Sequence, residues 1–246
     1  MFPIRDHNPS GRTPYVTYVL IGLNVLVFLS YLGLFNNPRA LSMLFFDWGI
    51  LPARISQGDG YETLLTSMFL HAGFMHLAGN MLFLWIFGDN LEDEMGHVGF
   101  LIFYLICGLG AGYVHVLSGS DSMVPTVGAS GAIAGVMGGY LLLFPKAKVD
   151  ILIIFIIFFR IFTIPAWILL AVWFILQFSG GLTANAHTGG VAYWAHAGGF
   201  IVGLALTLPF FLRRGGKHYW ARNEMHPPHP EAKYDPSNIP RVRRRR

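Results

Sequence analysis

The chain has 246 residues, of which 54% are hydrophobic and only 12% are charged, with a net charge of +4. Soluble domains carry about 25% charged residues, so this composition excludes an ordinary soluble domain and indicates a membrane protein. The single cysteine, Cys107, excludes an intramolecular disulfide and any metal centre that needs several thiolates. Because Cys107 lies in an apolar run, we interpret it as a packing residue rather than a nucleophile.

The first 14 residues are polar and lack the apolar core and cleavage site of a signal peptide. We expect them to form a cytoplasmic tail, and the apolar run that follows to be retained as an anchor. A helix needs about 20 residues to cross the hydrocarbon core, and six uncharged runs are close to that length. They are Tyr15–Leu34, Leu70–Gly88, Val98–Ser118, Thr126–Phe144, Ile161–Ser179 and Val191–Leu212.

The distribution of basic residues supports six crossings. With the N-terminus inside, 15 of the 17 Lys and Arg residues lie on the cytoplasmic side, and only Arg39 and Arg54 lie outside. The apolar piece Ile151–Phe159 is too short to cross, and we interpret it as an interfacial or re-entrant segment or an extension of its neighbour. We therefore predict an all-α membrane protein, a six-helix bundle over residues 15–212 with both termini in the cytoplasm.

The second predicted span begins with several polar residues. His76 and Asn80 are four residues apart, so they share a helix face. Polar side chains are costly inside a membrane and are functional candidates by default. Imidazole and amide N–H groups are suitable donors for the negative charge that develops on oxygen during acyl transfer. The alternative is a hydrogen-bonded pair that only stabilises helix packing.

The fourth span begins with the sequence GASG at positions 128–131. A nucleophilic serine must leave its hydroxyl oxygen open to attack, and glycines on either side provide that space because they have no Cβ. This makes Ser130 a candidate nucleophile, flanked by Gly128 and Gly131. Small residues are also common wherever membrane helices pack, so this motif alone favours packing.

The sixth span contains the sequence AHAGG at positions 195–199. A neutral imidazole can accept the proton of a serine hydroxyl, which makes His196 a candidate base. A histidine bonded to a neighbouring carbonyl is the alternative. In the six-span topology Ser130 and His196 both lie about 6–8 Å below the outer surface. Their matching depth is more specific evidence for a catalytic pair than either residue alone.

The pair predicts a dyad. No acidic residue lies in the outer half of any span, so we expect helix packing to orient the imidazole. GxxxG spacings at Gly131 and Gly135, and at Gly199 and Gly203, would let these two helices approach closely. A zinc hydrolase is disfavoured because there is no HExxH motif. We expect no metal and no cofactor.

The C-terminal segment, residues 213–246, is rich in Pro, His and Arg without apolar periodicity, and we predict it to be disordered. Its final six residues, RVRRRR, either fix the topology or contact anionic lipid head groups. A nucleic-acid partner is not expected for a protein with six spans.

Taken together, these motifs resemble those of the rhomboid intramembrane serine proteases, over about Tyr15 to Leu212. The resemblance implies a six-helix bundle with an outward cavity, in which Ser130 is the nucleophile and His196 the general base. It implies that His76, Asn80 and the Ser130 backbone form the oxyanion site.

The resemblance also implies that the loop at residues 35–69 lies partly in the membrane and that the fifth span is the mobile side where substrate helices enter. Two departures stand out. Tyr61 and Glu62 replace the family's Trp-Arg pair, and Ala134 replaces an aromatic residue that stacks on the histidine in some members.

The expected function is hydrolysis of peptide bonds in or near transmembrane segments of membrane-protein substrates, through an acyl-enzyme. The expected location is a bacterial inner membrane, from the compact core without a targeting peptide. An inactive rhomboid-like protein that binds membrane clients is the first alternative. A channel or transporter is the second, disfavoured because the chain shows no internal repeat and no charge in the middle of a span.

Overall fold

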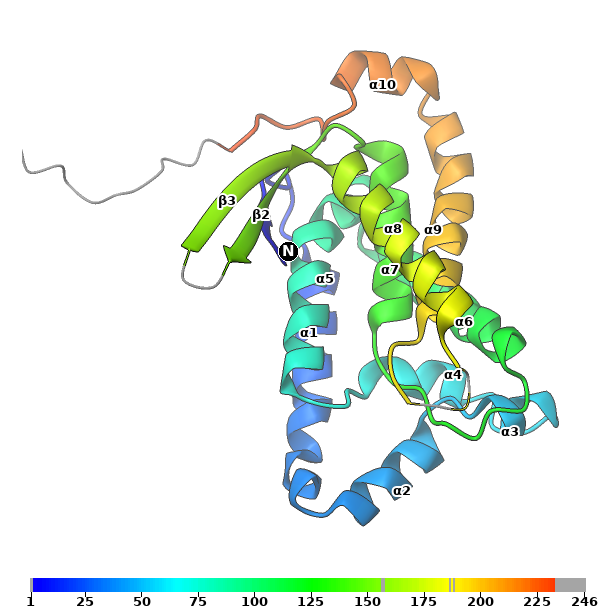
Figure 1. Cartoon of the computed structure of the whole chain (residues 1–246). Coiled ribbons are helices and arrows are strands. Elements are labelled where there is room, and N and C mark those ends of the chain that lie inside the picture. Colours follow the sequence, from blue (N-terminus) through cyan, green and yellow to red (C-terminus); the bar gives the residue numbers. More distant parts are fainter. Residues whose placement is uncertain (1, 156–157, 186, 188, 233–246) are drawn as a thin grey trace, which may run out of the picture.

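The computed structural model describes residues 2–155, 158–185, 187 and 189–232, and it is a bundle of helices with a small sheet at one end (Figure 1). Six helices build the bundle: α1 (Tyr15–Ser30), α5 (Phe74–Met95), α6 (His97–Ser118), α7 (Ser130–Leu143), α8 (Ala166–Thr183) and α9 (Tyr193–Arg213). Each lies largely within one of the six predicted spans.

These helices differ in whether their length and apolarity suffice to cross a membrane. Among the described residues, α6, α8 and α9 are long and apolar enough to cross. A fourth crossing follows if Thr63–Phe69 and Phe74–Met95, which meet at a 95° bend, count as one span. Because α1 and α7 are shorter apolar helices, the six crossings stay a prediction.

Helix α7 occupies the centre of the bundle, with every residue from Gly131 to Tyr140 buried. A helix that is apolar on all sides is expected to be enclosed in this way. A Cβ on Gly199 of α9 would collide with the Gly131 carbonyl, and one on Gly203 would collide with the Gly135 carbonyl. The predicted close approach through the two GxxxG spacings is therefore confirmed.

A three-stranded antiparallel sheet corrects the all-α prediction. It consists of β1 (Phe2–Asp6), β2 (Lys148–Phe155) and β3 (Phe158–Pro165), in that order. The described residues of the piece predicted at Ile151–Phe159 thus form strands and are not an extension of the neighbouring helix, while its interfacial or re-entrant position stays a prediction. Its run of isoleucine and phenylalanine favours a strand, and α8 begins only at Ala166, after Pro165.

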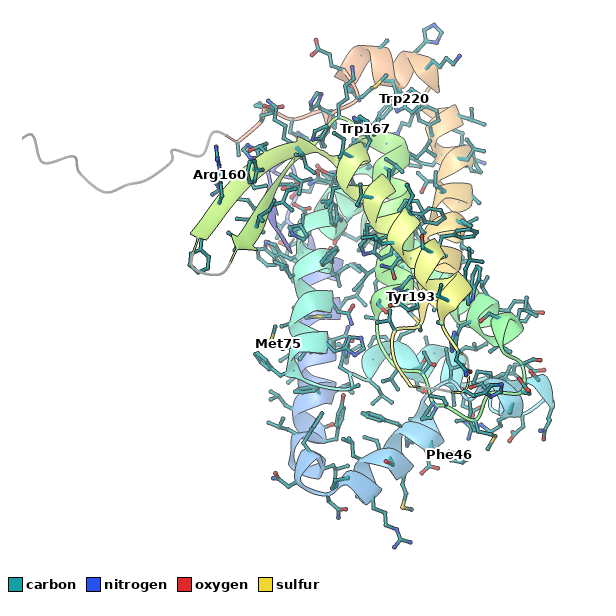
Figure 2. The ribbon with its side chains drawn as sticks, viewed as in Figure 1. Phe46, Met75, Arg160, Trp167, Tyr193 and Trp220 are labelled. Carbon is teal, nitrogen blue, oxygen red and sulfur yellow. The ribbon has the colours of Figure 1, made fainter. Side chains whose placement is uncertain are left out.

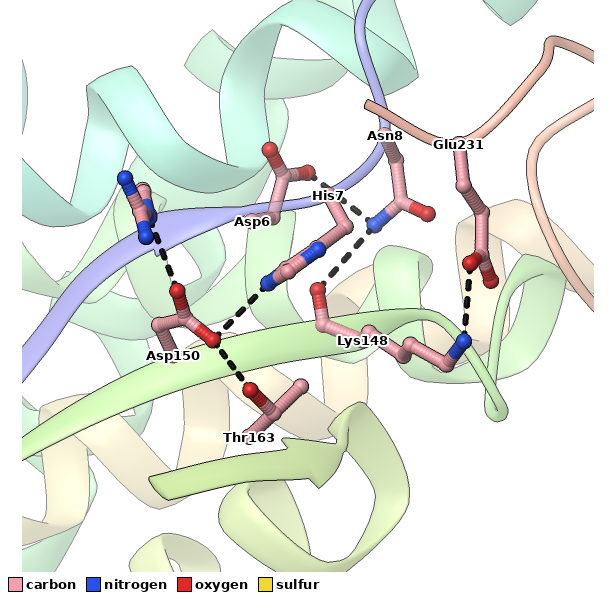
Figure 3. Close-up of polar contacts among 8 residues, drawn as sticks. Asp6, His7, Asn8, Lys148, Asp150, Thr163 and Glu231 are labelled. Carbon is pink, nitrogen blue, oxygen red and sulfur yellow. Dashed lines mark hydrogen bonds and ion pairs between the residues drawn. The ribbon is translucent and has the colours of Figure 1, made fainter. Parts of the chain in front are cut away.

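Polar contacts connect the strands of this sheet with one another and with the residues that follow β1 (Figure 3). The Asp150 carboxylate accepts hydrogen bonds from Arg5 Nε at 2.8 Å and from Thr163 Oγ1 at 2.6 Å, and it lies 2.8 Å from His7 Nε2. Asn8 Nδ2 donates to the Tyr140 hydroxyl of α7 at 3.0 Å. The N-terminal residues, expected to be a polar tail, are therefore an integral part of the fold.

The expectation of disorder after residue 212 is wrong for part of that segment. Residues Lys217–Asn223 form α10, and the chain then returns to the sheet, where Ala232 N donates to His7 O at 2.8 Å and Lys148 Nζ to Glu231 Oε2 at 2.8 Å. Both ends of the described chain thus meet at the same end of the bundle. The predicted Arg cluster lies outside the described residues.

The opposite end of the bundle carries the loop between α1 and α5. It holds η1 (Leu32–Asn36), α2 (Pro38–Trp48), α3 (Pro52–Ser56), α4 (Thr63–Thr66) and η2 (Ser67–Phe69). Figure 2 shows the exposed side chains of Phe46 in this loop and of Trp167 near the sheet, at opposite ends of the bundle. Aromatic residues at both ends are typical of the two membrane interfaces.

Candidate active site

The side chains of Ser130 and His196 lie in direct contact. Ser130 Oγ is 2.7 Å from His196 Nε2, the separation at which a serine hydroxyl donates a hydrogen bond to an imidazole nitrogen. Ser130 is the first residue of α7, and His196 lies in the first turn of α9. The structure therefore brings together the two residues that the sequence singled out as nucleophile and base.

The backbone before Ser130 holds a conformation that favours glycine. Gly128 has φ +136°, and a Cβ there would lie 2.8 Å from His76 Nε2 and 3.6 Å from Ser130 Oγ. Gly131 has a different role, because a Cβ there would lie 2.6 Å from Ala111 Cβ of α6. One flanking glycine keeps space open beside the serine, and the other permits helix packing.

The start of α7 also supplies backbone donors. The first N–H groups of an α-helix have no partner within the helix, and the helix dipole favours negative charge at this end. Ser130 stands at that position. An oxyanion formed beside Ser130 Oγ would therefore lie near unpaired N–H groups.

The two polar residues of α5 are arranged as hydrogen-bond donors. His76 Nδ1 accepts a hydrogen bond from the Ala72 backbone N–H at 3.3 Å, so the proton of the neutral ring lies on Nε2, the atom beside Gly128. Asn80 is buried, and its Nδ2 group has no hydrogen-bond partner among the described residues. A buried donor without a partner is costly and is ready to bind an incoming oxygen.

A cavity of about 570 Å³ connects these groups, and its lining includes Ser130, His196, His76, Asn80, Trp173 and Tyr193. It also reaches His115 of α6, whose Nε2 is 2.8 Å from Thr126 Oγ1 and which sequence reasoning did not single out. The predicted nucleophile, base and donors therefore share one cavity that can accept a peptide carbonyl.

Two supports of His196 were missed in the sequence. Gln177 Oε1 lies 2.7 Å from His196 Nδ1, and the Trp173 ring lies 5.8 Å from the imidazole, centroid to centroid. The expectation that helix packing alone would orient the imidazole is therefore wrong. Both residues come from α8, four positions apart on one helix face. The sequence did contain one signal for this contact, a glutamine inside an apolar span. It was missed because only acidic residues were considered as partners of the histidine.

Trp173 also compensates for one of the two departures from the family pattern, the alanine in place of an aromatic residue that stacks on the histidine. Ala134, four residues after the serine, is fully buried and offers no ring. The aromatic contact to the histidine comes from α8 instead of α7.

Comparison with known proteins identifies the family. The rhomboid domain model matches residues 58–213, which is more than half of the chain and includes every predicted site residue. The chain belongs to the rhomboid family. This is a family of integral membrane proteins, in accord with the apolar helices of the bundle.

Several curated rhomboid proteins are similar to this chain. The mitochondrial Rhomboid protein 1 of Saccharomyces cerevisiae is 30% identical over 204 residues, which cover 77% of this chain and 51% of that protein. RHOMBOID-like protein 4 of Arabidopsis thaliana is 32% identical, over 73% of this chain and 41% of that protein. Rhomboid protease GluP of Bacillus subtilis is 37% identical, over 52% of this chain and 24% of that protein.

The chain thus spans about half the length of these relatives or less. Some relatives are named as mitochondrial or chloroplastic and one is bacterial, so the predicted bacterial inner membrane stays a prediction.

Proposed function

We propose that this rhomboid protein is an intramembrane serine endopeptidase, which cuts peptide bonds in or near the transmembrane segments of other membrane proteins. The observation that supports this most is the 2.7 Å contact between Ser130 Oγ and His196 Nε2 inside an open cavity. The printed name of the Bacillus subtilis relative, a rhomboid protease, points to the same chemistry.

The first half of the reaction forms an acyl-enzyme. His196 Nε2 accepts the hydroxyl proton as Ser130 Oγ attacks the substrate carbonyl carbon, and the carbonyl oxygen becomes an oxyanion. When the tetrahedral intermediate collapses, the C–N bond breaks and the protonated imidazole gives its proton to the leaving amine. The acyl group stays on Ser130 as an ester.

The second half is hydrolysis. Water enters through the cavity and loses a proton to His196 Nε2 as its oxygen attacks the ester carbonyl. The C–O bond to Ser130 then breaks, the proton passes from His196 to Ser130 Oγ, and the product leaves as a carboxylic acid that gives its remaining proton to water. Every proton transfer in this sequence needs only Ser130, His196 and water.

Oxyanion stabilisation is assigned to His76 Nε2–H, Asn80 Nδ2 and the Ser130 backbone N–H. The support is the fixed tautomer of His76 and the unpaired buried donor of Asn80. A strong donor at this position is typically worth about 3–4 kcal/mol in the transition state.

The substrate class follows from the surroundings of the site. A peptide bond within an α-helix hides its carbonyl, so the favoured substrates are transmembrane segments with small or helix-breaking residues near the cut. The lipid bilayer is the other partner, and contact of the C-terminal Arg cluster with anionic lipid is part of the proposal.

The direct test is cleavage of a fluorescently tagged single-span peptide, with small and helix-breaking residues, by the purified protein in detergent. We expect the parent protein to cleave it and the Ser130→Ala and His196→Ala variants to lose cleavage by at least about 1,000-fold. A serine-reactive phosphonate should label the parent protein and fail to label Ser130→Ala.

The results for the parent protein and the two variants together distinguish the proposed protease from the alternatives. Cleavage that persists in both variants would assign the activity to another site or a contaminant. A parent protein that neither cleaves nor reacts with the phosphonate would support the inactive client-binding alternative. Client binding should then survive Ser130→Ala.

A further inference from the structure

Helix α8 is the most exposed helix of the bundle next to the site. Of its 18 residues only Ala166, Leu170 and Gly181 are buried. It nevertheless provides the acceptor on the far side of His196, where Nδ1–H donates to Gln177 Oε1 at 2.7 Å. Gln177 does not line the cavity, so it is placed to act on the histidine and not on a substrate.

The geometry assigns Gln177 as a positioning residue for the base, an inference that rests on the proposed function. A carbonyl oxygen only accepts hydrogen bonds, so the bond to Gln177 Oε1 requires the proton of the neutral imidazole to lie on Nδ1. The lone pair then lies on Nε2, where Ser130 must deliver its proton. The amide selects the reactive tautomer and fixes the ring plane without adding a charge.

The same bond makes the base depend on the position of α8. The neighbouring contacts between α8 and α9 are apolar, such as Phe174 against Phe200 with ring centroids 4.9 Å apart. Such contacts tolerate small shifts, whereas a hydrogen bond is lost beyond about 3.5 Å. His196 is therefore held in its reactive orientation only when α8 is packed against α9.

The primary test compares steady-state cleavage by the parent protein with that by Gln177→Leu, which keeps a similar volume and removes the acceptor. We expect kcat to fall about tenfold, the factor that corresponds to about 1.4 kcal/mol of lost orientation, with KM unchanged. Ser179→Ala is the matched control, because Ser179 Oγ donates to the Ile175 carbonyl of the same helix and to no other group among the described residues. It should keep the parent values.

Rescue by Gln177→Glu gives a readout that a purely structural role would not change. The carboxylate restores an acceptor for Nδ1–H, so kcat should recover at alkaline pH. An anion beside the ring makes it a stronger base, so the acidic limb of the rate profile should move to higher pH. A Glu variant that matches Gln177→Leu at all pH values would overturn the assignment.

A double-mutant cycle tests the dependence on α8. Phe174→Ala loosens the packing of α8 on Phe200 and should lower kcat in the parent background. It should have no further effect in the Gln177→Leu background, because the bond is already absent. Additive effects would show that α8 packing and the bond act independently and would overturn the coupling.

Failure of this inference is distinct from failure of the proposed function. If the parent protein cleaves the peptide and Gln177→Leu cleaves it equally well, Gln177 has no positioning role and the Ser130–His196 assignment stands. If the parent neither cleaves nor reacts with the phosphonate, the proposed function itself fails, and the positioning role fails with it.

Discussion

At the scale of single residues, two buried asparagines in the bundle differ in what their amide groups bind. Asn24 in α1 donates through Nδ2 to the Leu20 carbonyl of its own helix at 2.8 Å. Asn80 in α5 lines the cavity and leaves Nδ2 without a partner among the described residues. The N–H donor of Asn24 is thus bonded within its own helix, whereas the donor of Asn80 is available to a ligand.

This contrast yields a prediction for catalysis. Asn80→Ala should lower kcat by about 100- to 1,000-fold, the usual effect of removing one oxyanion donor, with little change in KM because the donor acts on the transition state. Asn24→Ala is the control, since it removes an equally buried amide that is remote from the cavity. It should lower the melting temperature and leave kcat unchanged. Equal kcat values for Asn80→Ala and the parent would remove Asn80 from the oxyanion site.

At the scale of elements, the sheet holds two aspartates in opposite electrostatic situations. Burial raises the pKa of Asp6 to about 6, against the smaller effect of hydrogen bonds from Asn8 and Tyr140. Burial also acts on Asp150, but hydrogen bonds from Thr163, Arg5 and His7 outweigh it and lower the pKa of that carboxyl. Ionisation is therefore unfavourable to folding at Asp6 and favourable at Asp150.

The two aspartates predict opposite responses to pH. The stability that neutral Asp6 provides is present below its unfolded pKa, near 3.9, and is lost as the pH rises through about 6. Asp6→Asn should therefore be more stable than the parent at pH 8 and lose that advantage by pH 4. Thermal unfolding in detergent at the two pH values measures this.

The second half of the prediction concerns Asp150. Its contribution is present above the unfolded pKa and is lost as the pH falls through the lowered value. Asp150→Asn should cost roughly 1–3 kcal/mol at pH 7, as expected for hydrogen bonds to a charged group, and progressively less below pH 4. Variants that shift in the same direction at every pH would contradict this account of the sheet.

At the scale of the whole molecule, the C-terminal segment closes the end of the bundle opposite the α2–α4 loop. Besides its contacts with the sheet, His229 Nε2 lies 2.7 Å from Asp93 Oδ2 at the end of α5. The segment thus ties together the N-terminal strand, the sheet and a bundle helix. All these contacts lie between residues 224 and 232.

Two truncations test this closure. Ending the chain after Asn223 removes these contacts and should lower the melting temperature by several degrees, while the folded fraction keeps its activity. Ending it after Ala232 keeps every one of them and should leave the melting temperature unchanged. If the two truncations behave alike, the segment between them does not stabilise the bundle.

The bundle helices were predictable because their signals are local. Long uncharged runs and repeated glycine spacings need no knowledge of distant residues, and the placing of Ser130 beside His196 followed from topology. The sheet was not predictable in this way. Its β1 strand lies in a polar stretch, and it pairs with residues more than 140 positions away, such as Phe2 with Leu152.

The site residues also divide into those with a local sequence signal and those whose role depends on contacts between helices. Ser130, His196, His76 and Asn80 belong to recognisable patterns, whereas Gln177 is an isolated glutamine whose importance depends on how α8 turns toward α9. Trp173 likewise makes the ring contact that the family resemblance places on α7 in some members. When a residue on one helix takes over a contact from a residue on another helix, the sequence of neither helix alone indicates it.

The enclosure of α7 has a consequence for bilayer thickness. With 14 residues, α7 is about 21 Å long, against about 30 Å of hydrocarbon. In the predicted six-span topology, protein rather than lipid surrounds α7, so this mismatch acts on the exposed helices instead. Exposed α8 must adjust to a thinner or thicker membrane, and it carries Gln177. The acyl-chain length of the surrounding lipid would then change the orientation of the His196 ring, while the position of Ser130 on α7 stays the same.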